Sequence, residues 1–179
     1  MLYCHNTEET GGLTMPIEFD IKLTSEDMYR FNMYQTYTGF HGWFSIFFSI
    51  VLFVLAAVKY GEMALSYTVM YVVFGVIFLF YMPLTLKIRS KQAINASEVL
   101  KNTLHYTVDE AGFTVSQGEE SATLPWEQIY KMTATKSNVL VYSNRTNAYV
   151  IPRSQLGDKF DPLKTFAKEK LPAYRVKIK

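Results

Sequence analysis

The chain has almost no cysteine. Cys4 is alone, so none of the disulfide frameworks that stabilise small secreted domains can form. The three histidines, His5, His41 and His105, stand at unrelated spacings, and without further cysteines they make no zinc-ligand pattern. We therefore expect no metal site and no cofactor, and we expect the soluble parts to face a reducing compartment such as the cytoplasm.

Charged residues are absent from two long stretches of the chain, residues 31–58 and 63–86. A bilayer core of about 30 Å requires roughly 20 apolar helical residues, and one charge at its centre costs about 2.5–3.5 kcal/mol on insertion scales. Both stretches meet these requirements, with the kernels WFSIFFSIVLFVLAAV and VMYVVFGVIFLFYMPL. The alternative is two buried helices of a soluble core, but a chain of 179 residues has too little else to cover both on all sides. The sequence predicts two transmembrane helices.

A cleavable secretory signal is also missing. Residues 1–30 are polar, and the first apolar stretch is longer than a signal-peptide core and is followed by no small-residue cleavage site. Residues 1–14 contain a Gly pair and no hydrophobic period, so we expect a disordered extension. Met15, which follows it, offers an alternative start.

The two apolar stretches predict a transmembrane hairpin over residues 39–86. We place its helices at about 41–59 and 63–86, and the link KYGE (59–62) is short enough to make them antiparallel. Both ends of the chain then lie on one side of the membrane.

Lysine and arginine close to helix ends mark the cytoplasmic side. The link contains Lys59 alone, whereas the far end of the second helix has Lys87, Arg89 and Lys91. Both termini are therefore predicted to be cytoplasmic.

Small residues inside the hairpin indicate where its helices approach each other. Folding the chain back at the link places Ser45 level with Gly75 and Val76, and Ser45 forms a small-xxx-small pair with Ser49. Such residues let membrane helices pack closely. The alternative is that serine is merely tolerated in an apolar helix. We take Ser45 and Gly75 as structural residues.

In the segments that flank the hairpin, the apolar residues follow other spacings along the chain. Residues 15–38 begin with the alternating PIEFDIKLT, typical of a half-buried strand, and continue through the helix start TSED into a membrane-approach helix. Residues 87–102 predict a helix that leaves the membrane. Residues 103–179 contain five or six short strands and a last helix that Asp161 should cap, with Pro162 in its first turn. The predicted fold class is α+β: a two-helix transmembrane hairpin inserted into a small antiparallel, pleckstrin-homology-like (PH-like) β-domain with a C-terminal helix.

The alternating strand at residues 17–23 needs a sheet to pair with, because an isolated strand is not stable in water. If both termini lie on one side, the available sheet is that of residues 104–152. We predict that the strand completes this sheet across the hairpin. Its apolar side chains should then contact the same core as Trp126: Ile17, Phe19, Ile21 and Leu23.

Trp126 lies in TLPWEQIYKM, where one predicted strand ends. It follows Leu124 by two positions and Ala122 by four, so the three share one face, and Pro125 ends the strand. We expect a core tryptophan at a strand corner with its ring N–H bonded to a backbone carbonyl. The functional alternative is a stacking platform for a ligand.

Together these features resemble the YcxB-like family of small bacterial membrane proteins. The stretches that carry the resemblance are the opening IEFDIKLTSEDMYRF, the hairpin, LPWEQIYKM (124–132), NVLVYS (138–143) and AYVIPRSQL (148–156). The resemblance implies a C-terminal YcxB-like, PH-like domain at the bacterial cytoplasmic membrane. It implies no catalytic residues, because the family has no established biochemical activity.

No catalytic motif is legible in the sequence. There is no Gly-rich phosphate loop and no nucleophile motif, and the acidic pairs at 109–110 and 119–120 fall in turns, where a solvated face is the usual role. We do not expect an enzyme.

Basic residues gather near the C-terminus: Lys168, Lys170, Arg175, Lys177 and Lys179. Each base near an anionic leaflet contributes about 1 kcal/mol, so we expect this end of the domain to rest on anionic lipid headgroups. The alternative is an ordinary solvated helix end and tail. Nucleic-acid binding is not expected, because no aromatic platform is interleaved with the bases.

The leading hypothesis is a non-enzymatic membrane protein whose cytoplasmic PH-like domain binds a protein or a lipid headgroup. The rival is a subunit of a small oligomeric transporter or channel. The absence of charged residues inside either predicted span weakens the rival, since substrate pathways usually contain them.

Overall fold

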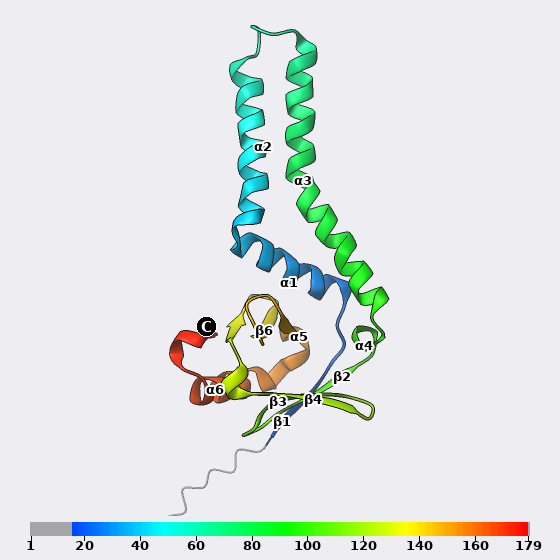
Figure 1. The fold of residues 1–179 in the computed structure, drawn as a ribbon, viewed down its shortest axis with the longest axis vertical. Helices are drawn as coiled ribbons and strands as arrows, with labels where there is room; N and C mark the ends of the chain where they lie inside the picture. Colours follow the sequence, from blue (N-terminus) through cyan, green and yellow to red (C-terminus); the bar gives the residue numbers. More distant parts are fainter. Residues whose placement is uncertain (1–15, 179) are drawn as a thin grey trace, which may run out of the picture.

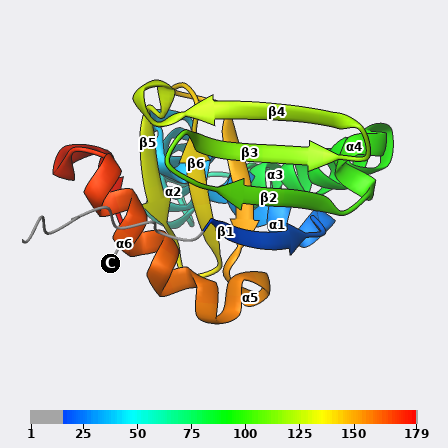
Figure 2. The same cartoon turned by 90° about the horizontal axis from the view of Figure 1, so that it is seen from below.

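A computed structural model of the chain describes residues 16–178 and has a mixed α+β architecture with largely antiparallel sheets. In Figure 1 two long helices, α2 (Phe40–Val58) and α3 (Leu65–Ala96), project from a β-rich domain, and α1 (Ser25–Thr38) lies across their base. Figure 2 shows the domain from the end away from these helices, with the strands of one sheet running across those of the other. The predicted disordered extension, residues 1–14, lies outside the described residues.

The first sheet joins one strand from before the long helices to three strands from after them. Its order is β1-β2-β3-β4. The strands are β1 (Ile17–Ile21), β2 (Leu104–Val108), β3 (Gly112–Gln117) and β4 (Glu120–Pro125). β1 pairs antiparallel with β2 over its whole length, with Phe19 opposite Tyr106. The prediction that the N-terminal strand completes the later sheet is confirmed.

The second sheet has the order β7-β6-β5-β8. Its strands are β5 (Lys131–Ala134), β6 (Asn138–Tyr142), β7 (Ala148–Pro152) and β8 (Val176–Lys177). The pairs β5–β6 and β6–β7 are antiparallel, whereas β8 adds parallel to β5. The sequence did not indicate β8.

The core lies between the two sheets and includes side chains of the C-terminal helix α6 (Phe160–Lys170). The ring of Phe19 stacks on that of Tyr106 with centroids 5.4 Å apart, and Phe166 of α6 lies 5.6 Å from Trp126. Phe19, Ile21 and Leu23 are all buried in one cluster with Trp126, and Ile17 packs against it. The strand that precedes the long helices therefore shares a core with the far end of the chain, as predicted.

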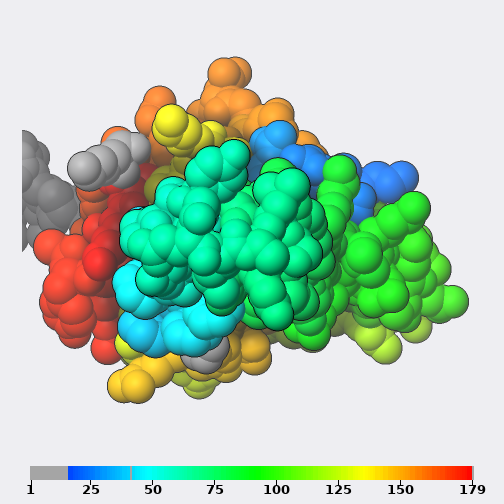
Figure 3. Space-filling view, turned by 90° about the horizontal axis from the view of Figure 1, so that it is seen from above, coloured from blue at the N-terminus to red at the C-terminus, as the bar shows by residue number. Residues whose placement is uncertain are grey.

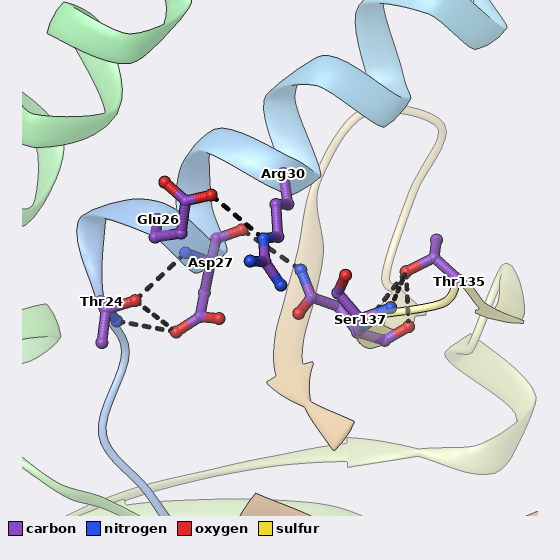
Figure 4. Close-up of polar contacts among 7 residues, drawn as sticks. Thr24, Glu26, Asp27, Arg30, Thr135 and Ser137 are labelled. Atoms are coloured by element: carbon purple, nitrogen blue, oxygen red, sulfur yellow. Dashed lines mark hydrogen bonds and ion pairs between the residues drawn. The ribbon is translucent and has the colours of Figure 1, made fainter. Parts of the chain in front are cut away.

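Helix α1 begins at a complete capping box. The Thr24 hydroxyl accepts the backbone N–H of Asp27 at 3.2 Å, and the Asp27 carboxylate accepts the backbone N–H of Thr24 at 3.1 Å (Figure 4). Within the helix start TSED that the sequence indicated, Thr24 is the cap.

A sharp bend separates α1 from α2. Residues 25–38 and 42–58 meet at 71°. The Trp43 indole N–H donates to the Tyr37 carbonyl at 3.1 Å across the bend. At Gly42 a Cβ would come within 2.8 Å of the Tyr37 ring, so the bend needs a glycine there. As a result α1 crosses the base of the long helices instead of continuing α2 (Figure 1).

Helices α2 and α3 pack side by side, and two serines bond to the partner backbone. The Ser45 hydroxyl donates to the Phe78 carbonyl at 2.6 Å, and the Ser49 hydroxyl donates to the Gly75 carbonyl at 2.7 Å. The expected level of Ser45 with Gly75 is therefore wrong, since Ser49 holds that place. The link spans residues 59–64 instead of 59–62, which shifts the pairing of the helices.

Gly75 is nevertheless a close-packing residue. A Cβ on Gly75 would lie 2.8 Å from the Phe53 ring, so an aromatic ring fills the space that its missing side chain leaves.

Helix α3 runs on through Pro83, so the expected second span (63–86) and the first part of the expected exit helix (87–102) form one helix, followed by the short α4 (Glu98–Lys101). By length and composition, α3 is the one described helix that can cross a membrane by itself. Residues 25–38 and 42–58 pass the same test only when counted together across their bend.

Short helices that the sequence did not indicate surround α6. They are α5 (Arg153–Leu156) and η2 (Gly157–Lys159) before it and η3 (Ala173–Arg175) after it. The residue before α6, Lys159, already has helical backbone angles, and Phe160 begins the helix. The expectation that Asp161 caps this helix is therefore wrong: Asp161 lies in the first turn, where its negative charge favours the helix dipole.

Replacing Phe19 by Ala should destabilise the part of the domain that follows the long helices. Removal of a buried phenylalanine costs about 3–5 kcal/mol, and Phe19 is 4% exposed. Urea unfolding followed by Trp126 fluorescence, in a Trp43→Phe background, measures this loss. The control is Glu18→Ala, an exposed position of the same strand. Equal stability of the two variants would contradict the shared core.

Candidate functional site

An apolar cavity of ≈ 330 Å³ lies between the two sheets, beside α4. Its walls come from β2, β3 and β4 of the first sheet, from β7 of the second, from α1 and the residue Leu23 before it, and from α4. Apolar side chains form most of the lining, among them Leu23, Leu100, Leu104, Val115, Ala122 and Val150. A cavity of this volume and composition is typical of a small-ligand site.

The tip of the β3–β4 pair forms one wall of the cavity. Gln117 is the last residue of β3 and has no pairing partner in β2. Its side-chain amide donates to the Val99 carbonyl of α4 at 3.1 Å. This bond holds the tip against α4. The residues of β4 at the cavity include Ser121 and Ala122, which are too small to fill the space.

Tyr106 is the most deeply buried polar residue of the lining, at 1% exposed. Burial raises the pKa of its hydroxyl well above the usual range, and the neighbouring Tyr149, which also lines the cavity, raises it further. Tyr106 therefore stays a neutral hydroxyl at physiological pH. Such a group can fix the orientation of a ligand in apolar surroundings through one hydrogen bond.

The lining suits an uncharged, mainly apolar ligand. Glu120 is its one ionisable carboxylate, in an exposed position at the start of β4, and its described residues include no lysine, arginine or histidine. A buried charge without an opposite charge is strongly unfavourable. The lining therefore offers a ligand apolar contacts and the Tyr106 hydroxyl.

This cavity was not predictable from the sequence. Its lining residues come from segments far apart in the chain, and each is an ordinary inward-facing or turn residue of its own element. The convergence depends on the pairing of β1 with β2, which the pattern within one segment does not report.

Trp126 lies in the short helix η1 (Trp126–Gln128), directly after β4. It is 4% exposed, its indole N–H donates to the Asp109 carbonyl at 2.9 Å, and its ring meets that of Phe113 edge to face at 5.3 Å. The prediction of a core tryptophan bonded to a backbone carbonyl is confirmed. Its ring is not part of the cavity lining.

His105 and Asp20 form a pair on the polar outer face of the first sheet. Their side chains meet at 2.7 Å between Nδ1 and Oδ1, and both are exposed to solvent. Ser116, on the adjacent strand, donates to the His105 backbone carbonyl at 3.5 Å and not to the ring. The three residues therefore lack the hydroxyl-to-imidazole bond of a nucleophilic triad.

The predicted basic residues are spread over α6, η3 and β8 at one side of the domain. Lys170 forms an ion pair with Glu110 and lies near the Phe166 ring. Arg175 donates to the carbonyls of Glu127 and Ile129 at 3.4 and 3.2 Å. Lys168 and Lys177 are exposed, and Lys179 lies outside the described residues.

Several polar contacts join α1 to the second sheet. The Asn138 side-chain amide donates to the Asp27 carbonyl at 3.2 Å, near the turn that contains Thr135 and Ser137 (Figure 4). The Gln35 side chain donates to the Thr146 carbonyl at 2.9 Å and accepts the Tyr142 hydroxyl at 3.3 Å.

These contacts place the β6–β7 turn, residues 143–147, against α1. Arg145, an exposed base in this turn, was not singled out from the sequence. Figure 1 shows this part of the second sheet below the long helices.

Among the described residues, no group of three or more His, Cys, Asp or Glu side chains is placed to hold a metal ion.

Residues 108–167 match the family model described as YcxB-like protein. The matched segment runs from the end of β2 into α6 and includes Trp126 and most of both sheets. The resemblance predicted from the sequence is thus confirmed for this segment. No curated protein and no solved structure matches the chain.

Alkaline pH should destabilise the domain through its buried tyrosines. Burial, with a smaller effect of Tyr34, raises the pKa of Tyr142 to about 12. Unfolding returns this pKa to about 10. The folded chain then holds the proton more tightly, so the contribution to stability is complete below about pH 10 and is lost as the pH rises through the folded pKa.

Urea unfolding at pH values between about 9 and 11.5 measures this effect. Tyr142→Phe should reduce the fall in unfolding free energy with pH, whereas Tyr174→Phe, at a tyrosine that is 73% exposed, should leave it unchanged. An identical pH dependence in both variants would contradict the assignment.

Proposed function

We propose that this chain is a non-enzymatic integral membrane protein of the bacterial cytoplasmic membrane. In this proposal α2 and α3 form a two-helix transmembrane hairpin, both termini are cytoplasmic, and the β-domain is a PH-like module that binds a protein or lipid partner. The observation that carries the binding role is the apolar cavity with the buried Tyr106 hydroxyl.

The surface of the α2–α3 pair supports the membrane assignment. Large apolar side chains cover it on all sides and are more than half exposed, for example Phe44, Phe47, Leu65, Val69 and Phe80. Soluble monomers rarely expose an apolar surface of this extent. Only 6% of the most apolar part of α3 is buried, unlike the core helix of a soluble protein.

Serine hydroxyls inside the pair are consistent with a lipid surrounding. Ser45 and Ser49 both donate to carbonyls of α3, so neither needs water. The same bonds argue against the rival function of a transport or channel subunit, since they use the two buried serine hydroxyls of α2 for packing instead of for lining a pathway.

The basic residues at the cytoplasmic ends of the helices support the proposed orientation. Lys87, Arg89 and Lys91 lie on α3 where it leaves its apolar part, and Arg145 lies in the β6–β7 turn next to α1. Figure 3, seen from above, shows the long helices standing over the domain. Bases in this position are suited to anionic headgroups.

Only some of the C-terminal bases are proposed to contact anionic lipid headgroups. Lys170 and Arg175 have partners within the domain, so Lys168 and Lys177 are the members of the predicted set most available to a headgroup.

A neutral apolar ligand, such as the acyl chain of a lipid, fits the cavity that the domain holds between its sheets. Tyr106 would supply the hydrogen bond that orients it.

Cysteine labelling tests the topology. In a Cys4→Ser background, Gln92→Cys places a thiol at an exposed position of α3 on the domain side, and Tyr60→Cys places one in the link, where Tyr60 is 71% exposed. In intact cells an impermeant thiol reagent should label position 60 and should reach position 92 only after lysis. Labelling of position 92 alone in intact cells would overturn the orientation.

Native mass spectrometry of the full chain, released from detergent, tests the binding role. We expect the purified protein to retain an apolar small molecule, and Val115→Phe, which fills part of the cavity, to lose it. Thr107→Val, on the outer face of β2, is the matched control and should retain it. A protein without a bound mass, or a bound mass that Val115→Phe leaves unchanged, would count against the cavity as the site.

A further inference from the structure

β4 is an uncovered sheet edge. Among the described residues it has a strand neighbour on one side alone, β3, and its first four residues are all exposed. The other edge of this sheet, β1, is covered: the Lys22 backbone N–H donates to the Gln155 side chain at 2.8 Å, and Lys159 donates to the Glu18 carbonyl. In Figure 2 no other strand follows β4 on its outer side.

Most of the usual protections of a free edge are missing from β4. Such edges are normally blunted by charged side chains, above all lysine, by an internal proline, by a bulge or by a covering helix, and β4 has one charge, at its first residue, Glu120. β4 has the sequence ESATLP, in which Pro125 stands only at the end, and it pairs with β3 residue for residue from Gly112 to Gln117. An edge of this kind is a template for another strand.

A second β4 fits this edge in one register. A shift of the pairing by one residue would turn the side chains of one strand to the opposite face of the sheet. If the inner faces of both copies are to stay on the same side, the possible registers therefore differ in steps of two residues. With Ala122 opposite its own copy, Ser121 lies opposite Thr123 and Glu120 opposite Leu124. This register pairs residues 120–124, keeps the two Glu120 side chains apart, and sets hydroxyls opposite each other, which is a favourable cross-strand combination.

The orientation of the sheet allows this pairing for two chains in one membrane. Neighbouring antiparallel strands are related by a two-fold axis perpendicular to their sheet. Figure 1 shows the first sheet edge-on below α1, and Figure 2, turned by 90°, shows it face-on. The two-fold axis therefore runs along the direction of α2 and α3, so both copies project these helices the same way.

We infer that the chain forms a two-fold dimer through antiparallel pairing of β4 with β4 of a second copy. The pairing continues the first sheet across the dimer. It rests on the proposed membrane topology only in that the parallel direction of the helices permits both copies to share a bilayer.

Disulfide crosslinking of the full chain in membranes tests the register. Directly opposed residues have Cβ atoms about 4.5–5.5 Å apart, within reach of a disulfide, whereas residues offset by two positions are too far apart. In a Cys4→Ser background, mild oxidation should crosslink Ala122→Cys, and should leave Ser121→Cys and Thr123→Cys largely uncrosslinked when each is expressed alone. Coexpressed copies of the last two should crosslink to each other. Glu18→Cys, on the covered edge, is the matched control.

Charge at position 122 gives a second, independent test. Ala122→Lys and Ala122→Glu each place like charges opposite one another and should weaken association of fluorescently tagged copies, measured by energy transfer, by about fivefold. Coexpression of the two variants should restore it. The dimer is wrong if Ala122→Cys crosslinks no more than Glu18→Cys, or if neither charge variant changes energy transfer.

Failure of the dimer is distinguishable from failure of the membrane proposal. Alkaline carbonate extraction of the same samples reports membrane integration whatever the crosslinking result. A chain that resists extraction but gives no β4 crosslink contradicts the dimer alone.

Discussion

The pairing of β1 with β2 is the constraint on which the rest of the structure depends. It joins Ile17–Ile21 to Leu104–Val108 and thereby closes a loop that contains α1, α2, α3 and α4. Closing a long loop is entropically unfavourable, and the burial of Phe19 and Ile21 against Tyr106 and Val108 offsets it. The cavity depends on the same pairing, since Leu23 and Leu104 reach its wall from the two ends of the loop.

The long helices are held to the domain by more than the chain itself. Asn32 donates to the Ser90 hydroxyl at 2.9 Å, which ties α1 to α3, and Gln35 and Asp27 tie α1 to the second sheet. The capping box at Thr24 and the glycine at position 42 fix where α1 starts and where it turns into α2. Helix α1 thus connects the apolar pair to the β-domain through specific hydrogen bonds on both sides.

The features that could be predicted from the sequence are those that depend on neighbouring residues in the chain, such as the buried face of a strand. The alternation of residues 17–23 indicated a buried face, and the absence of any other sheet identified its partner. Trp126 followed Leu124 and Ala122 at a strand end, which predicted both its burial and its bonded N–H. The way in which segments far apart in the chain pack against each other could not be predicted from such patterns. The pairing of Ser49 with Gly75 depends on where α2 and α3 end, and β8 and α5 are too short to have a period of their own.

The split arrangement of the first sheet also sets an order of events during synthesis. β1 leaves the ribosome before α2 and α3, but its partner β2 is made only after both helices. At about 10 residues per second, β1 waits on the order of ten seconds for a partner. The first sheet can therefore form only after both apolar helices have been synthesised. Throughout that interval Phe19 and Ile21 have no core to enter, and these two side chains are buried only when β2 and the later strands are in place.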